Sequence, residues 1–179
     1  MNHFKYLILL VLISTSFELS SQDTLDMKEV YIDNDLVYKM DGQRFTGLAQ
    51  HRRKNGNLVY EEEYKDGVIL SYLQYYKGKE KNLFFKLNYN RYKLWKFEKE
   101  FYYSRDGELY QTVSFDENGK KILLEKFENN KVTYSCEYNG KKRHGQEMCY
   151  DDDGNKLIFQ YVNGKKVRKK KRKEKHDGK

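Results

Sequence analysis

Proline is absent from the 179 residues, and the sequence holds only two cysteines and one tryptophan. Without proline, no rigid linker divides the chain into separate domains. Long hydrophobic runs are also missing. The apolar run from Tyr6 to Ile13 is too short for a membrane-spanning helix, which needs about 20 apolar residues.

Catalytic side chains are scarce as well. Two of the four histidines, His3 and His176, lie near the chain ends. Neither His51 nor His144 has a cysteine, histidine or carboxylate at metal-ligand spacing. The glycines are spaced as turns, not as a phosphate-binding loop, and the aspartates at 151–153 lack the terminal glutamate of a calcium loop. The sequence therefore predicts no catalytic, cofactor-binding or metal site, and a protein that is not an enzyme.

The N-terminus has the layout of a secretory signal peptide. Lys5 precedes the apolar run, a small polar stretch follows it, and small side chains at Ser20 and Ser21 form a cleavage site before Gln22. We therefore predict that residues 1–21 are a signal peptide and that the protein is exported to the periplasm, the cell envelope or the exterior. The alternative is that the apolar run forms a first β-strand.

The net charge of +8 is concentrated at the C-terminus. Residues 165–179 contain ten Lys or Arg and two acidic residues, so the rest of the chain carries equal numbers of each sign. Blocks of like charge are usually solvated, and we predict a disordered basic tail at residues 168–179. This tail could bind anionic lipid or glycan surfaces of the envelope. Nucleic acid is a less favoured partner, because the tail lacks interleaved aromatic side chains for base stacking.

Turn signals recur along the body of the chain, mostly 10 to 12 residues apart. Asn-Gly and Asp-Gly pairs close tight hairpins, because both positions of such turns accept a positive φ. Between the turns, apolar residues alternate with period two, as in Leu58, Tyr60 and Tyr64. The predicted fold class is all-β: an elongated, single-layer antiparallel meander of β-hairpin repeats at residues 22–167, between the signal segment and the disordered tail.

Self-similarity indicates that the hairpins are copies of one repeat. Gly47 precedes Gly56 by nine residues, and Gly145 precedes Gly154 by the same nine. Each second glycine is followed by a strand, an aromatic residue and a further turn glycine. The segment from residue 68 to residue 97 fits least well, and we interpret it as degenerate copies. The predicted turn glycines of the repeat are Gly47, Gly56, Gly67, Gly107, Gly119, Gly145, Gly154 and Gly164.

Two blocks resemble the bacterial variant of the MORN repeat found in YwqK-like antitoxin components. They are Phe45-Thr46-Gly47 through Tyr64-Lys65-Asp66-Gly67, and His144-Gly145 through Tyr161-Val162-Asn163-Gly164-Lys165. The resemblance covers residues 36–167, with a poorer middle. It implies hairpins stacked into a twisted sheet, and partner binding without catalysis. Combined with export, it leads to the hypothesis of an immunity-type role against a toxin in the envelope.

The 17 tyrosines and 10 phenylalanines admit two interpretations. Alternating rings can pack across neighbouring hairpins and hold a single sheet together. They can also present a rigid face that binds an unidentified protein partner. The alternative function is a structural or adhesive envelope protein held by its tail. The candidate partner-binding residues are Tyr60, Tyr64, Trp95, Tyr102, Tyr103, Phe115, Tyr150 and Tyr161.

The two cysteines could form a disulfide in an exported protein. The apolar pattern favours a register in which Cys136 pairs with Met148 and Tyr134 with Tyr150. That register would place Cys136 and Cys149 on opposite faces of the sheet. A disulfide would then require a bulge or an altered turn.

Overall fold

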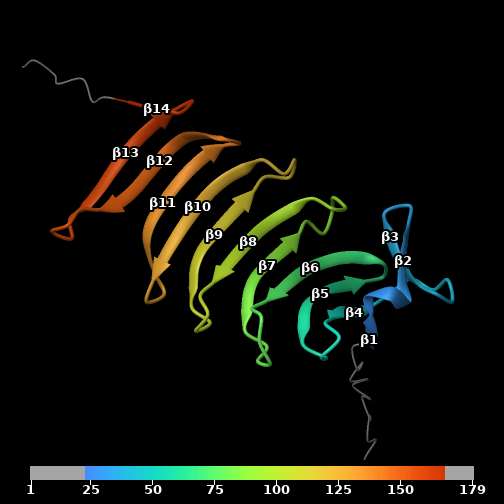
Figure 1. The fold of residues 1–179 in the computed structure, drawn as a ribbon. Helices are drawn as coiled ribbons and strands as arrows, with labels where there is room; N and C mark the ends of the chain where they lie inside the picture. The colour runs from blue at the N-terminus through green and yellow to red at the C-terminus, as the bar shows by residue number, and fades with distance from the viewer. Residues whose placement is uncertain (1–22, 168–179) are drawn as a thin grey trace, which may run out of the picture.

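The computed structural model describes residues 23–167, which form an open twelve-stranded sheet (Figure 1). The predicted signal peptide and basic tail lie outside the described residues. Strands β4 to β14 follow one another in chain order, each antiparallel to the next. This confirms the predicted all-β meander. The strands are β1 (Asp23–Asp26), β4 (Gly47–Arg52), β5 (Leu58–Lys65), β6 (Val68–Tyr75), β7 (Leu83–Tyr89), β8 (Phe97–Tyr103), β9 (Leu109–Phe115), β10 (Lys121–Glu128), β11 (Lys131–Asn139), β12 (Lys142–Tyr150), β13 (Lys156–Val162) and β14 (Lys165–Lys166).

The turns form where the sequence supplies residues that accept a positive φ. Asp66 and Gly67 have φ values of 51° and 78°, which suit the two-residue turn between β5 and β6. Other turns are longer. In the β4–β5 turn, the Gly56 amide donates to the Arg53 carbonyl at 2.9 Å, and Gly56 itself has a φ of 83°. Glycine accepts this conformation at little cost, so the residues within each turn determine its conformation.

Eight of the eleven neighbouring pairs of strands in the large sheet contain a register shift, such as the one between Glu63 and Tyr64 of β5 where it meets β6. A β-bulge bends its strand and increases the local right-handed twist. The repeated bulges accompany the strong curvature of the sheet in Figure 1. Most strands are seven to nine residues long, which is longer than the turn spacing alone suggests.

The N-terminal end has a structure that the repeat pattern did not predict. β1 pairs with β4 in parallel, and the chain between them forms a 3-10 turn, η1 (Met27–Glu29), and a separate hairpin of β2 (Val30–Asp33) and β3 (Leu36–Lys39). This hairpin packs on one face of the sheet. The resulting core is fully shielded from solvent, and it consists of Val37, Phe45, Ala49, Tyr64 and Ile69. The hairpin therefore covers one end of a sheet that is otherwise a single layer.

The two faces of the sheet differ in composition. Residues that pair directly across strands share a face. One line of such pairs contains Glu62, Tyr72, Leu87, Glu100 and Val113 on β5 to β9. The adjacent line on the other face contains Glu63, Ser71, Asn88, Lys99 and Ser114. We call the first the aromatic face, because the ring side chains described below project from it, and the second the polar face.

The register between β11 and β12 corrects the prediction for the two cysteines. Cys136 pairs with Glu147, so side-chain alternation places Cys149, two residues further along β12, on the same face as Cys136. The turn that pairs Asn139 with Lys142 sets this parity. A bulge, in which residues 144–146 of β12 oppose only residue 137 of β11, then shifts the register by two residues and leaves the faces unchanged. Both thiols are free in the structure.

Gly145 makes this bulge possible. It has a φ of 98°, and a Cβ atom there would overlap the carboxylate of Glu137, which accepts a hydrogen bond from the Gln146 amide at 2.8 Å. Its counterpart in the first repeat copy, Gly47, leaves room for the backbone carbonyl of Asp23 in β1. The first glycine of the repeat thus allows a close approach in both copies, although a different group approaches each one.

Candidate binding face

A row of aromatic rings crosses six neighbouring strands on the aromatic face. Neighbouring ring centroids are 5.0 to 6.3 Å apart, which is the range for favourable ring pairs. The rings are half-buried, except for that of Tyr110, which is exposed. Beyond the N-terminal hairpin, no second layer covers this face in the described part of the chain (Figure 1). The row, called the aromatic row below, consists of His51, Tyr60, Tyr72, Phe85, Tyr102 and Tyr110.

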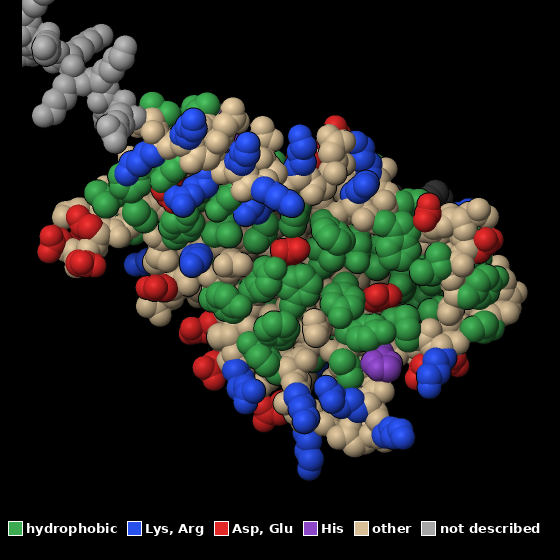
Figure 2. Space-filling model, turned by 45° about the horizontal axis from the view of Figure 1, so that its top comes forward, with side chains coloured by type: hydrophobic (Ala, Val, Ile, Leu, Met, Phe, Trp, Pro, Cys, Tyr) green, Lys and Arg blue, Asp and Glu red, His purple; other side chains and the backbone are tan. Residues whose placement is uncertain are grey.

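Two carboxylates lie beside this row. Glu62 accepts a hydrogen bond from the hydroxyl of Tyr64, and Glu100 accepts one from the hydroxyl of Tyr102 at 2.8 Å. Figure 2 shows acidic side chains within the band of hydrophobic side chains on this face. The face therefore combines apolar rings with negative charge.

The tyrosines around these carboxylates remain neutral hydrogen-bond donors at physiological pH. Burial and the hydrogen bond to Glu100 raise the pKa of Tyr102 to about 12. Burial and the nearby charge of Glu62 raise the pKa of Tyr89 to about 12. Burial and the same carboxylate also raise the pKa of Tyr60. Glu62 thus lies among several tyrosine hydroxyls, and the negative charge on the face belongs to the carboxylates.

A second group of rings follows the other margin of the aromatic face. The Phe97 ring lies 5.7 Å from that of Tyr89 and 5.9 Å from that of Phe115, both in edge-to-face geometry. Phe97 is exposed, whereas Tyr89 packs against the core under the N-terminal hairpin. This group continues the apolar band toward β9.

The structure brings together only some of the residues predicted from the sequence. Tyr60 and Tyr102 lie in the aromatic row, and Phe115 lies in the second group of rings. Tyr64 is buried in the N-terminal core. Trp95 packs against the same core from the β7–β8 loop, where its indole Nε1 donates to the Asp35 carbonyl at 3.0 Å.

The remaining predicted residues lie elsewhere. Tyr103 directly follows Tyr102 and so projects from the polar face, as does the exposed Tyr150 near the C-terminal end. Tyr161 lies on the aromatic face beside Arg143, whose guanidinium is 4.9 Å from its ring centroid. Tyr72 and Phe85 belong to the aromatic row, and sequence reasoning did not single them out. Period-two alternation in β6 and β7 could have identified them, had the bulged registers been known.

A polar cluster occupies the C-terminal part of the aromatic face. Buried Glu147 accepts hydrogen bonds from the Tyr134 hydroxyl at 2.7 Å and from Arg143 at 2.9 Å. Burial favours its neutral form, but these hydrogen bonds and the Arg143 charge outweigh burial and lower the pKa of Glu147. Burial also raises the pKa of the adjacent Cys136 thiol. A buried thiol with a raised pKa is a poor nucleophile, so this cluster fits a structural network better than a reactive site.

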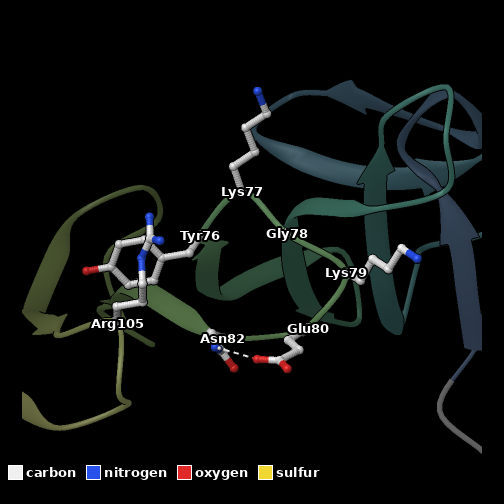
Figure 3. A pocket seen from close by; sticks show the side chains of 7 residues that line it. All are labelled: Tyr76, Lys77, Gly78, Lys79, Glu80, Asn82 and Arg105. Atoms are coloured by element: carbon white, nitrogen blue, oxygen red, sulfur yellow. Dashed lines mark hydrogen bonds between the residues drawn. The ribbon is translucent and has the colours of Figure 1, made fainter.

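The hollow in Figure 3 lies between the β6–β7 loop and the β8–β9 turn and has a volume of about 240 Å³. Its side chains do not converge on a common point. The Arg105 guanidinium stacks on the Tyr76 ring at 5.5 Å from the centroid, while Lys77 and Lys79 point away from the hollow. The lining residues are Tyr76, Lys77, Gly78, Lys79, Glu80, Asn82 and Arg105.

Within residues 23–167, no three His, Cys, Asp or Glu side chains lie close enough together to hold a metal ion. No helix in that same part of the chain is long and apolar enough to cross a lipid bilayer.

No protein-family model matches the chain, and no curated protein matches it. One solved structure, the crystal structure of a GtfA/B complex bound to UDP and GlcNAc, is similar over 74% of this chain, with 13% identity and a TM-score of 0.34. The match spans 23% of that chain. A likeness this weak supports no conclusion about fold or function.

Proposed function

We propose that this chain is a non-catalytic, exported repeat protein that binds a protein partner through its aromatic face. The aromatic row is the observation that supports the proposal most directly. Rigid rings offer large contact areas at little cost in conformational entropy, and such residues dominate the binding energy of protein interfaces. Here they form a continuous row on a face that, within residues 23–167, only the N-terminal hairpin covers at one end.

The carboxylates define the chemistry of the partner. Glu62 and Glu100 lie among tyrosine rings, a combination that favours ammonium and guanidinium groups through charge and through the ring faces. The partner segment should therefore present lysine or arginine together with apolar side chains. The resemblance to antitoxin components extends the proposal to an immunity-type role, in which this segment belongs to a toxin that acts in the envelope.

Substitutions on opposite faces of the sheet provide the test. Tyr102 and Phe101 are adjacent on β8, and side-chain alternation places them on opposite faces. We expect Tyr102→Thr, combined with Tyr60→Thr, to weaken partner binding by more than about tenfold, because anchor residues are removed. Phe101→Thr should change binding by less than about twofold.

The measurement is affinity capture from envelope extracts of the producing cells, with mass spectrometry to identify what each variant retains. The proposal is supported if one protein is retained by the wild type and by Phe101→Thr and is lost with the double variant. It is wrong if that protein is retained equally by all three while circular dichroism shows intact sheets. Threonine is used because it is compatible with strands.

A further inference from the structure

A Gly-Lys-Lys sequence recurs at three turns, and all three turns lie on the same edge of the sheet. In a meander, alternate turns fall on the same edge, and these are the β9–β10, β11–β12 and β13–β14 turns. The repeat therefore places lysine pairs side by side on one edge. We call them the lysine ridge: Lys120, Lys121, Lys141, Lys142, Lys165 and Lys166.

Backbone hydrogen bonds hold the three turns together. The Gly140 amide donates to the Lys121 carbonyl at 2.9 Å, and the Gly164 amide donates to the Arg143 carbonyl at 2.8 Å. Successive turns on one edge are two strands apart, which is roughly 10 Å. The lysine ridge is therefore a fixed feature of the folded sheet. Figure 2 shows Lys and Arg side chains in a row along the edge that leads to the C-terminal segment.

Most of the ridge charge is available to a ligand. Lys120, Lys141, Lys142 and Lys165 are exposed, and across the described part of the chain none of them forms an ion pair. Lys121 and Lys166 instead lie over aromatic rings, with their ammonium groups 3.5 Å and 3.2 Å from the ring centroids.

The two acidic residues of the β9–β10 turn interact with groups of the chain itself. The Asp116 carboxylate accepts hydrogen bonds from the Asn118 and Lys120 amides at 2.9 Å each, which lowers the pKa of Asp116. Glu117 pairs with Lys93 at 3.3 Å. The edge therefore presents positive charge, although residues 1–164 carry no net charge.

We propose that the lysine ridge binds the surface of an anionic lipid bilayer. A row of turns on the rim of a sheet can meet a flat array of headgroups, and each lysine near such a surface contributes to binding. Each Gly-Lys-Lys turn pairs two lysines without an aromatic side chain between them, whereas base stacking requires rings interleaved with the cations. The proposal goes beyond partner binding, since a sheet standing on this rim leaves its aromatic face free.

The position of the ridge in the chain supports this proposal. The last lysine of the ridge, Lys166, lies two residues before a segment at 168–179 that contains eight more Lys or Arg. Sequence reasoning assigned a possible surface contact to residues 168–179 alone, whereas the fold adds a set of cations within the described residues.

The test uses two charge-matched variants of the full chain. The ridge variant carries Lys120→Gln, Lys141→Gln, Lys142→Gln and Lys165→Gln. The control variant carries Lys54→Gln, Lys77→Gln, Lys79→Gln and Lys131→Gln, which are exposed residues in turns and loops on the opposite edge. Both variants lose the same charge and keep the C-terminal segment. Binding is measured by co-sedimentation with vesicles of equal parts phosphatidylglycerol and phosphatidylcholine, and with vesicles of phosphatidylcholine alone.

We expect the wild type to bind the anionic vesicles and to be released by high salt, because screening weakens contacts between exposed charges. The ridge variant should bind more than about tenfold more weakly, and the control variant within about twofold of the wild type. Equal losses in both variants, or equal binding of the wild type to both kinds of vesicle, would overturn the proposal. So would a ridge-dependent loss of binding to a DNA duplex with vesicle binding unchanged, which would assign the ridge to nucleic acid.

Discussion

Glu61 on β5 shows how single residues hold the polar face together. It is only 4% exposed, and its carboxylate accepts hydrogen bonds from the Tyr75 hydroxyl and from Gln50 at 2.8 Å. Lys81, from the β6–β7 loop, forms an ion pair with it at 3.0 Å. Burial favours the neutral form, but these partners outweigh burial and lower the pKa of Glu61 below its ordinary value of 4.5.

The lowered pKa predicts how stability depends on pH. Because the folded state favours the charged form of Glu61, its contribution is present above pH 4.5 and is lost as the pH falls through the folded-state value. We expect Glu61→Gln to lower the free energy of unfolding by about 2 kcal/mol near neutral pH. The difference from wild type should shrink in acid. Urea denaturation across a pH series measures the difference in unfolding free energy between Glu61→Gln and the wild type.

The exposed Glu80 provides the control for this prediction, since it lies in the neighbouring loop. Glu80→Gln should leave the unfolding free energy within about 0.5 kcal/mol of the wild type. A difference between Glu61→Gln and wild type that stays constant from neutral to acidic pH would show that the charge of Glu61 does not contribute.

At the scale of elements, the N-terminal hairpin is attached to the sheet by a distant loop. Trp95 of the β7–β8 loop bonds to Asp35 in the β2–β3 turn and packs against Tyr89, with ring centroids 6.1 Å apart. Its φ is 59°, a conformation that bulky residues rarely adopt, so the surrounding contacts must hold it. The tryptophan therefore acts as a clamp on the hairpin.

We predict that Trp95→Ala loosens this hairpin without unfolding the rest of the sheet. The Val37 and Phe45 amides, which donate to Gly67 and Val37 at 2.8 Å and 2.9 Å, should exchange with solvent faster. The expected drop in their local opening free energy is about 2 kcal/mol, because apolar contacts and one hydrogen bond are lost. Hydrogen exchange followed by NMR gives the measurement.

Tyr92 in the same loop is 96% exposed, so Tyr92→Ala is a matched control and should leave these amides unchanged. Faster exchange throughout β9 to β12 in Trp95→Ala would contradict the clamp and would indicate that the sheet opens as one unit.

At the scale of the whole molecule, the strands from β4 to β14 contact chiefly their immediate neighbours. Such an arrangement behaves as a quasi-one-dimensional repeat protein, whose stability is roughly a sum over units and their interfaces. Loss of one end should therefore weaken the remainder without abolishing it. A closed globule would respond differently, since removal of part of its single core would unfold it.

Truncation after Asn139 tests whether the stability of the sheet is a sum over its strands. The shortened chain ends with β11 and lacks β12 to β14. We expect it to keep a cooperative β-sheet by circular dichroism, with unchanged exchange protection in β5 to β7 and reduced protection in β10 and β11. A fully unfolded product would contradict the additive picture. Aggregation through the new edge strand is limited by working at low concentration.

Much of the fold could be predicted from local residues. Pairs such as Asp66-Gly67 and Asn163-Gly164 adopt the positive φ values expected of hairpin turns. The prediction failed where no such pair marks the turn. The β7–β8 loop contains no glycine, and its conformation depends on Trp95 and its contacts with the N-terminal hairpin. The β2–β3 turn at Asn34 and Asp35 also lacks glycine.

The candidate site was less accessible to sequence reasoning. Tyr60 and Tyr102 were identified, but Tyr64 is buried and Tyr103 projects from the opposite face. Aromatic composition indicates that rings are available, whereas their grouping depends on cross-strand register. Each bulge changes that register, and the bulge at Gly145 involves Glu137 of the preceding strand, whose carboxylate accepts from the Gln146 amide.

The sequence by itself determined where the chain turns and that its strands alternate in polarity, because φ preferences and period-two patterns act over a few residues. Only the tertiary structure decided which rings share a face, and that three Gly-Lys-Lys turns lie on one edge of the sheet. Those features depend on strand pairing and bulged registers, which no single strand determines. Contacts between residues far apart in the chain, such as Trp95 with Asp35, placed the N-terminal hairpin over one end of the sheet.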